Sequence, residues 1–183
     1  MKNLDQKKNW AVLSTGMIVC LLVRLIPFRA PNVEPILATQ MPFAKAYGGI
    51  VGFFFGVLSI VIYDMVTGTA GIWTLITASA YGIVGFGAAW FFQNRAATRK
   101  NFFTFAIAST LFYDAITGLT IGPLFFHQSF TAALAGQIPF TALHVFGNAM
   151  FALLVSPALY SFLINHEKSK TKNLQVAYQL INQ

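Results

Sequence analysis

The stretch Tyr63-Asp64-Met65-Val66-Thr67-Gly68 returns later in the chain as Tyr113-Asp114-Ala115-Ile116-Thr117-Gly118. Each copy closes a long apolar run, and this pattern predicts two helices that each carry a carboxylate near one end. A glycine after the aspartate is typical of a helix stop, so one interpretation is that Gly68 and Gly118 end their helices. Charge beside a membrane span also marks ligand pathways, so a binding role stays open. Between the copies, we expect Asp64 to be the more structural one and Asp114 to contact a ligand.

Only 9% of the 183 residues are charged and 56% are hydrophobic, whereas a soluble domain carries about 25% charged residues. The chain has too little polar surface to cover itself in water, so we expect an integral membrane protein of spanning helices in a lipid bilayer. The net charge of +7 follows from the positive-inside rule, so nucleic acid is not an expected partner. The single Cys20 excludes an internal disulfide and fits a small packing residue.

Outward from the repeat, the chain divides into six apolar segments. They are Trp10–Phe28, Ile36–Tyr47, Gly48–Thr67, Gly71–Phe92, Asn101–Thr117 and Gln137–Leu163. The first begins like a signal peptide but lacks a small-residue cleavage site, so we expect it to remain as a helix. The prediction is an all-α membrane protein: a six-transmembrane-helix bundle over residues 1–165, followed by a polar cytoplasmic tail over residues 166–183. A short helix is expected between Gly118 and Gly136.

Basic residues predict the orientation of this bundle. Six spans place both termini on one side, and every Lys and Arg except Arg24 and Arg29 then falls on that side. Cytoplasmic loops are enriched in these residues, so the N- and C-termini are predicted to be cytoplasmic, in the cell membrane of a prokaryote. The short segment Ile36–Tyr47 has to cross as well, because otherwise the basic Arg95–Lys100 loop would lie outside.

Acidic residues gather on the opposite, outer face: Glu34, Asp64 and Asp114 map there. Arg24 lies about one turn inside that face, where it either snorkels to the lipid headgroups or pairs with one of these acids. We favour pairing, because the three acids lie at the same depth. The acidic outer face favours a ligand with a cationic or amine group.

Polar and aromatic side chains recur at helical spacing on two other segments. Thr141, His144 and Asn148 are three and four residues apart, so they share one face of their helix. Such a stripe is either interhelical glue or a set of ligand contacts, and we favour ligand contacts. Trp73 and Tyr81 share a face of the fourth segment, either as a membrane-interface belt or as a flat wall against a ring or a cation.

Several catalytic motifs are absent from the sequence. No G-x-x-x-x-G-K-[ST] phosphate loop occurs, so any ATP hydrolysis would come from another chain. No H-E-x-x-H or G-x-S-x-G motif occurs, and the three histidines lack metal-site spacing. We therefore expect no enzyme activity, no cofactor and no metal. An intramembrane enzyme using Asp64, Asp114 and His144 is the least favoured alternative.

Four stretches resemble the substrate-binding S component of energy-coupling-factor transporters. They are Pro31-Asn32-Val33-Glu34-Pro35, the glycine-rich third segment ending in Tyr63-Asp64, Gly71-Ile72-Trp73-Thr74-Leu75-Ile76-Thr77-Ala78, and Gln137-Ile138-Pro139-Phe140-Thr141 with His144. The resemblance covers nearly the whole chain and is one of architecture, not of a strict motif. It implies capture of a small water-soluble micronutrient, such as a vitamin, and its delivery inward with a separate transmembrane coupling subunit and cytoplasmic ATPases. The alternative is a non-transporting membrane scaffold of the cell-shape type.

The resemblance also implies a site in the outer half, under the loop after the first helix and against helices four to six. By position, its substrate contacts would be Asn32, Glu34, Trp73, Asp114, Gln128, Gln137, His144 and Asn148. Asp64 and Tyr81 join this set from the repeat and the aromatic face. The family often docks its coupling subunit through Ala-x-x-x-Ala on helix one. Here the equivalents are Ala11-x-x-x-Thr15 and Gly16-x-x-x-Cys20, which depart from that pattern; the other small-residue packing face is Gly48, Gly52 and Gly56.

Overall fold

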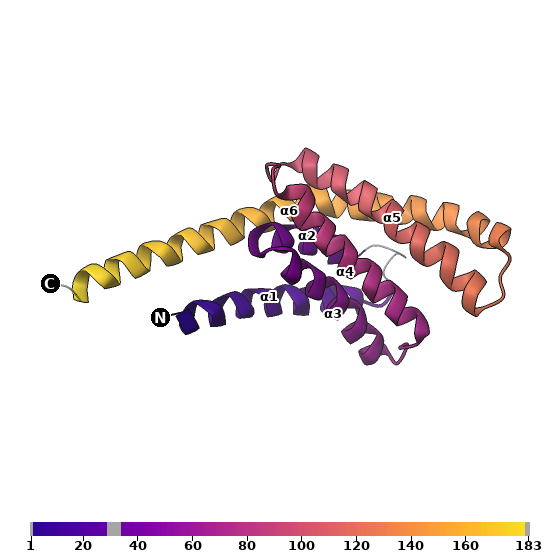
Figure 1. The fold of residues 1–183 in the computed structure, drawn as a ribbon, viewed down its shortest axis with the longest axis horizontal. Coiled ribbons are helices and arrows are strands. Elements are labelled where there is room, and N and C mark those ends of the chain that lie inside the picture. The colour runs from indigo at the N-terminus through magenta and orange to yellow at the C-terminus, as the bar shows by residue number, and fades with distance from the viewer. Residues whose placement is uncertain (1, 29–33, 182–183) are drawn as a thin grey trace.

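The computed structural model describes residues 2–28 and 34–181, and within them the chain is all helical. The helices are α1 (Lys2–Arg24), α2 (Ile36–Tyr47), α3 (Gly49–Thr67), α4 (Ile72–Phe92), α5 (Arg99–Phe125) and α6 (Phe130–Ile181). Figure 1 shows both termini at one end of the molecule and the α3–α4 and α5–α6 turns at the other end. The α3–α4 and α5–α6 hairpins therefore run side by side with α2 between them.

Within the described residues, four helices are long and apolar enough to cross a membrane. These are α3, α4, α5 and the part of α6 from Phe130 to His166. The apolar part of α1, Trp10–Arg24, is shorter, and α2 has only 12 residues. Large apolar side chains such as Leu75, Trp90 and Phe146 are exposed on the outer surfaces of the bundle. An apolar surface of this extent is typical of a multi-pass membrane protein.

The short helix α2 is the centre of the bundle. Every side chain from Ile36 to Ala44 is buried, because α2 contacts α3, α4 and α6. Gln40 is fully buried, and its Nε2 donates to the carbonyl oxygens of Gly52 at 2.9 Å and Tyr81 at 2.7 Å. One amide on α2 therefore ties α3 to α4, and α2 packs against protein on all sides.

Helices α3 and α4 are in backbone contact, and glycine makes this possible. A Cβ atom on Gly52 would lie 2.8 Å from the carbonyl oxygen of Gly85, and one on Gly56 would lie 2.7 Å from that of Tyr81. Real Cβ atoms do not approach a backbone so closely, so larger residues at these positions would push the helices apart. The glycine face of α3 is thus a packing face, as expected, and its partner is α4 of the same chain.

The predicted ends of α5 and α6 were wrong. α5 does not stop at Thr117 but continues through Gly118 to Phe125, and no separate short helix follows it. α6 begins at Phe130 instead of Gln137, so Pro139 lies inside the helix. Gly118 is not a helix stop: a Cβ atom there would collide with the side-chain amide of Gln137 on α6. The glycine makes room for a neighbouring side chain.

α6 is much longer than a membrane is thick. It has 52 residues, which corresponds to about 78 Å at 1.5 Å per residue, whereas the apolar core of a bilayer is about 30 Å thick. The segment predicted as a polar tail continues this helix as far as Ile181. Figure 1 shows α6 extending beyond the other helices toward the C-terminus.

Candidate functional site

Asp114 of α5 and His144 of α6 form a buried pair. Oδ1 of Asp114 lies 2.7 Å from Nδ1 of His144, and the residues are 1% and 3% exposed. The prediction that Asp114 lies near the end of its helix was wrong, because α5 continues past it to Phe125. The carboxylate is therefore in the interior of a helix and faces another helix, instead of lying in water at a helix end.

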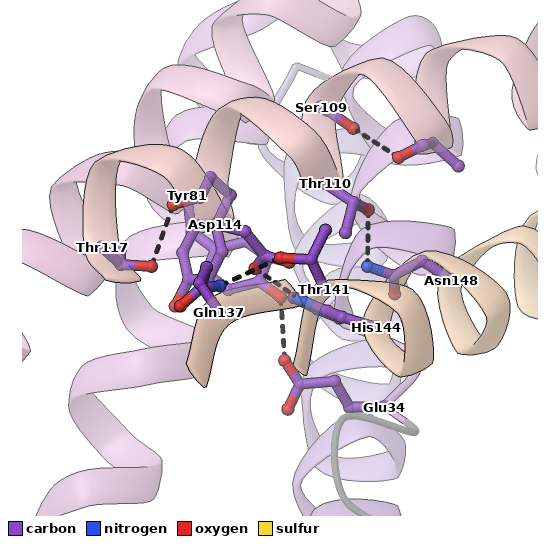
Figure 2. Close-up of polar contacts among 12 residues, drawn as sticks. Glu34, Tyr81, Ser109, Thr110, Asp114, Thr117, Gln137, Thr141, His144 and Asn148 are labelled. Carbon is purple, nitrogen blue, oxygen red and sulfur yellow. Dashed lines mark hydrogen bonds and ion pairs between the residues drawn. The ribbon is translucent and has the colours of Figure 1, made fainter. Parts of the chain in front are cut away.

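A second polar contact lies one turn further along the same two helices. Nδ2 of Asn148 on α6 donates to Oγ1 of Thr110 on α5 at 2.8 Å, and both residues are buried. Thr110 and Asp114 are four apart on α5, and His144 and Asn148 are four apart on α6, so the two contacts form a ladder (Figure 2). We call Thr110, Asp114, His144 and Asn148 the buried polar cluster.

Two tyrosines lie beside the buried polar cluster. The rings of Tyr81 on α4 and Tyr113 on α5 have centroids 4.4 Å apart at an interplanar angle of 49°. The Tyr113 ring also meets His144 edge to face, with centroids 5.9 Å apart. We call these three rings the aromatic wall, and it lies next to polar groups.

Glu34 links the segment before α2 to this wall. The Tyr81 hydroxyl donates to Oε1 of Glu34 at 2.8 Å, as Figure 2 shows. Nε of Arg24 lies 3.0 Å from Oε2 of Glu34 in an ion pair, and Nη1 of Arg24 donates to the Ser59 carbonyl oxygen at 3.0 Å. The guanidinium carbon of Arg24 lies 3.7 Å from the centre of the Tyr63 ring. The predicted pairing of Arg24 with an acid is confirmed, and the acid is Glu34.

A small void lies between the buried polar cluster and the aromatic wall. Its lining is Leu37, Tyr81, Val84, Ser109, Thr110, Tyr113, His144 and Asn148. It contains about 160 Å³ of empty space and is too narrow at every point for a water molecule. Any polar atom that faces it has to find its partner in protein or in a ligand.

Three polar atoms of the buried polar cluster have no hydrogen-bond partner among the described residues. They are Oδ2 of Asp114, Nε2 of His144 and Oδ1 of Asn148. A buried polar atom without a partner costs about 1–3 kcal/mol. Three such atoms on adjacent turns of two helices are more than packing requires, and they are what a binding site for a polar ligand would present.

Asp64, the other aspartate of the repeat, has a different surrounding. Its Oδ2 accepts a hydrogen bond from Oγ1 of Thr74 at 2.6 Å, and that hydroxyl accepts one from the backbone N–H of Gly71 at 3.1 Å. The carbonyl oxygen of Asp64 also accepts from the backbone N–H of Thr69 at 2.9 Å. Asp64 thus fastens the α3–α4 turn, and the structure does not bring it to Asp114 and His144.

The remaining predicted site residues lie nearer the turns. Trp73 packs against Phe126, with ring centroids 5.9 Å apart, and its indole N–H donates to the Thr69 carbonyl oxygen. Gln128 is exposed and lies against Gly122. Gln137 is half-buried and donates to Oγ1 of Thr141 at 3.0 Å. Asn32 lies outside the described residues. The structure therefore gathers Glu34, Tyr81, Asp114, His144 and Asn148 from the predicted set.

Two residues of the site were not predicted. Tyr113 completes the aromatic wall, and its position in the repeat directly before Asp114 was the available signal. Thr110 completes the ladder, and its signal was the four-residue spacing from Asp114 on the same helix. Both residues are recognised as part of the site once α5 is known to pack against α6 along Thr110 and Asp114.

No protein-family model, curated protein or solved structure matches this chain. The class of protein therefore rests on the fold and the site. The chain is an all-helical protein with four helices, among the described residues, that could span a membrane, and it carries a polar cluster in the middle of the bundle. Within the described residues, no group of three His, Cys, Asp or Glu side chains could hold a metal ion.

Proposed function

We propose that this chain is a substrate-capture subunit of the energy-coupling-factor kind, which binds a small water-soluble micronutrient. The observation that carries the proposal is the buried polar cluster, which keeps three buried atoms without a partner among the described residues inside an apolar bundle and whose His144 and Asn148 line an aromatic-walled void. Polar groups at membrane depth are costly and usually mark a substrate pathway. A purely structural ladder would use both ends of its amides and carboxylates, whereas this one leaves an atom on each of three side chains.

The arrangement of charges supports six spans with cytoplasmic termini. Nζ of Lys45 donates to the carbonyl oxygens of Phe92 and Arg95, both at 2.9 Å. This contact brings Lys45 to the basic α4–α5 connection, in the half of the molecule where the termini lie in Figure 1. Arg24 lies in the last turn of α1, where it pairs with Glu34. The basic half would face the cytoplasm of a prokaryotic cell, and the site would open to the outside.

Delivery of the ligand would need other subunits, because the sequence has no phosphate loop. The cytoplasmic ATPases and a transmembrane coupling subunit would supply the work. An open apolar groove between α1 and α6 supports such an assembly. Ala11, Thr15 and Gly16 of α1 line it together with Leu154 and Ala158 of α6. Small side chains of this kind allow close approach of a partner helix in a membrane.

The test is to purify the full chain from its native membrane and identify bound small molecules by mass spectrometry. Thermal unfolding is then measured with a panel of vitamins and nucleobases. We expect one co-purified compound, stabilisation by that compound, and co-purification of an ATPase-bearing complex. The absence of both stabilisation by every panel member and association with an ATPase would overturn the proposal.

The non-transporting scaffold is the second candidate, and the groove between α1 and α6 is the observation that favours it, since a partner helix could dock there without any transport. The two candidates differ at the buried polar cluster. A scaffold predicts that His144→Ala weakens folding or partner binding while uptake in cells is unaffected. Substrate capture predicts loss of ligand binding in a variant that still folds.

A further inference from the structure

The polar atoms left over in the buried polar cluster are mostly acceptors. Asp114 uses Oδ1 toward His144 and keeps Oδ2 without a partner among the described residues. Asn148 uses its Nδ2 to donate to Thr110 and keeps Oδ1. A carboxylate oxygen and an amide oxygen can only accept hydrogen bonds. Two buried acceptors on adjacent helices are thus left without a donor among the described residues, and Asn148 also lines the void.

The third leftover atom, Nε2 of His144, does not change this balance. With the Asp114 carboxylate beside it, Nδ1 of the ring carries a proton and donates to Oδ1. Nε2 then accepts when the ring is neutral and donates only when the ring is protonated. The two oxygens of Asp114 and Asn148 accept in both states.

Two of the hydroxyl groups around the void use their hydrogens inside the protein. Ser109 donates to the Phe105 carbonyl oxygen at 2.7 Å, and the Tyr81 hydroxyl donates to Glu34 at 2.8 Å. The charge of Glu34 is offset by Arg24, which lies 3.0 Å away. Among the described residues, His144 is the side chain that pairs with the Asp114 carboxylate. Oδ2 of Asp114 and Oδ1 of Asn148 therefore favour a ligand that brings hydrogen-bond donors.

We propose, on the basis of the substrate-capture function above, that the ligand enters this site with N–H donors first. Its buried end is a flat nitrogen heterocycle bearing an amino or amidine group. The N–H groups donate to Oδ2 of Asp114 and Oδ1 of Asn148, and the ring lies against Tyr81 and Tyr113. A carboxylate or phosphate end is disfavoured, because it would face these two acceptors. Binding has to widen the void, which is too narrow for water in this state.

The test uses matched probes that exchange an amino group for an oxo group, in adenine with hypoxanthine and in cytosine with uracil, or a cationic amidine for an anionic carboxylate, in benzamidine with benzoate. Binding to the purified full chain is measured by calorimetry and thermal stabilisation. In at least one pair we expect the amino or amidine member to bind about tenfold tighter or more, since leaving a buried acceptor unpaired has a cost of that order. Asp114→Asn replaces an acceptor with a donor and should reduce or reverse the preference. Asp64→Asn, the same change in the other copy of the repeat, should leave it unchanged.

The outcomes separate the ligand class from the function. Equal binding within every pair that binds, or preference for the oxo or carboxylate member, overturns the donor-rich class and leaves substrate capture standing. If none of the probes binds, the chemistry of the co-purified compound tests the ligand class. A compound with N–H donors supports the donor-rich class, and a compound without them overturns it. If nothing binds and nothing co-purifies, substrate capture itself fails, and the class fails with it.

Discussion

Asp64 and Asp114 occupy equivalent positions in two copies of one sequence, and the two copies share their local structure. Thr67 and Thr117 each donate back to the carbonyl oxygen of the tyrosine that opens the copy, at 2.8 and 2.9 Å. Ser59 and Ser109 each donate to the carbonyl oxygen four residues before, both at 2.7 Å. Within the two helices, the same residues therefore form the same local hydrogen bonds in both copies.

The surroundings of the two aspartates then diverge. α3 ends at Thr67 and is capped by Gly68, which has φ 69° and ψ 19°. Asp64, in the last turn of α3, is half-buried and holds the turn into α4. α5 continues past Gly118, so Asp114 is only 1% exposed and faces His144. The difference comes from the neighbouring helix: α6 packs against α5 at Asp114, whereas Asp64 lies at the turn into α4. Position in the fold, not the motif, makes one aspartate a turn residue and the other a candidate ligand contact.

The largest expected difference between the copies is in stability. Asp114→Ala leaves the buried His144 without its partner, and removal of one member of a buried pair costs about 3–5 kcal/mol. Asp64→Ala loses a hydrogen bond at a half-buried site, which costs about 0.5–1.5 kcal/mol. Thermal unfolding in detergent, followed by tryptophan fluorescence, should show the larger fall in Tm for Asp114→Ala. Equal falls would mean that Asp114 is not buried as described.

The second prediction concerns coupling between the aspartates and their partners. A double-mutant cycle of Asp114→Asn with His144→Gln should give an interaction free energy within the range of about 0.5–3 kcal/mol for residues in contact. The matched cycle of Asp64→Asn with Thr74→Val should give a smaller value, because its hydrogen bond is partly exposed to solvent. A cycle of Asp64→Asn with His144→Gln is the control and should give no coupling. Coupling in that control would place both aspartates in one network.

The smallest expected effect separates the two glycines that follow the aspartates. Gly68→Ala puts a side chain on a residue with φ 69°, which costs about 1–2 kcal/mol. Gly118→Ala replaces a glycine inside a helix, which gains about 0.5–1 kcal/mol, while the half-buried Gln137 side chain moves aside. The Tm should therefore fall for Gly68→Ala and hold or rise for Gly118→Ala. Falls of the same size in both would show that α5 also ends at its glycine.

The patterns of the sequence predicted part of this picture. The shared face of Thr141, His144 and Asn148 followed from spacing alone, because any α-helix places residues three and four apart on the same face. The pairing of Arg24 followed from the three acids predicted to lie at the same depth. The course of α5 past Gly118 did not follow, because glycine serves equally as a helix stop and as a point of close approach. Only the packing of Gln137 from a distant part of the chain decides between these uses.

The helix boundary also decided which residues of the site were missed. With α5 predicted to stop at Thr117, Asp114 belonged to a helix end, and its neighbour Tyr113 had no partner to face. Once α5 runs on against α6, Tyr113 meets Tyr81 and His144, and Thr110 meets Asn148. Contacts between residues this far apart in sequence depend on the register of two helices, which local patterns do not specify.

The most direct test of the account is ligand affinity in the two aspartate variants. Once the co-purified compound is identified, its Kd is measured for the wild type, Asp64→Asn and Asp114→Asn in lipid nanodiscs. The account predicts that Asp114→Asn weakens binding at least about tenfold, which corresponds to about 1.4 kcal/mol, and that Asp64→Asn leaves Kd unchanged. Equal affinity in Asp114→Asn and the wild type, or a loss confined to Asp64→Asn, would contradict the assignment of the site to the second copy of the repeat.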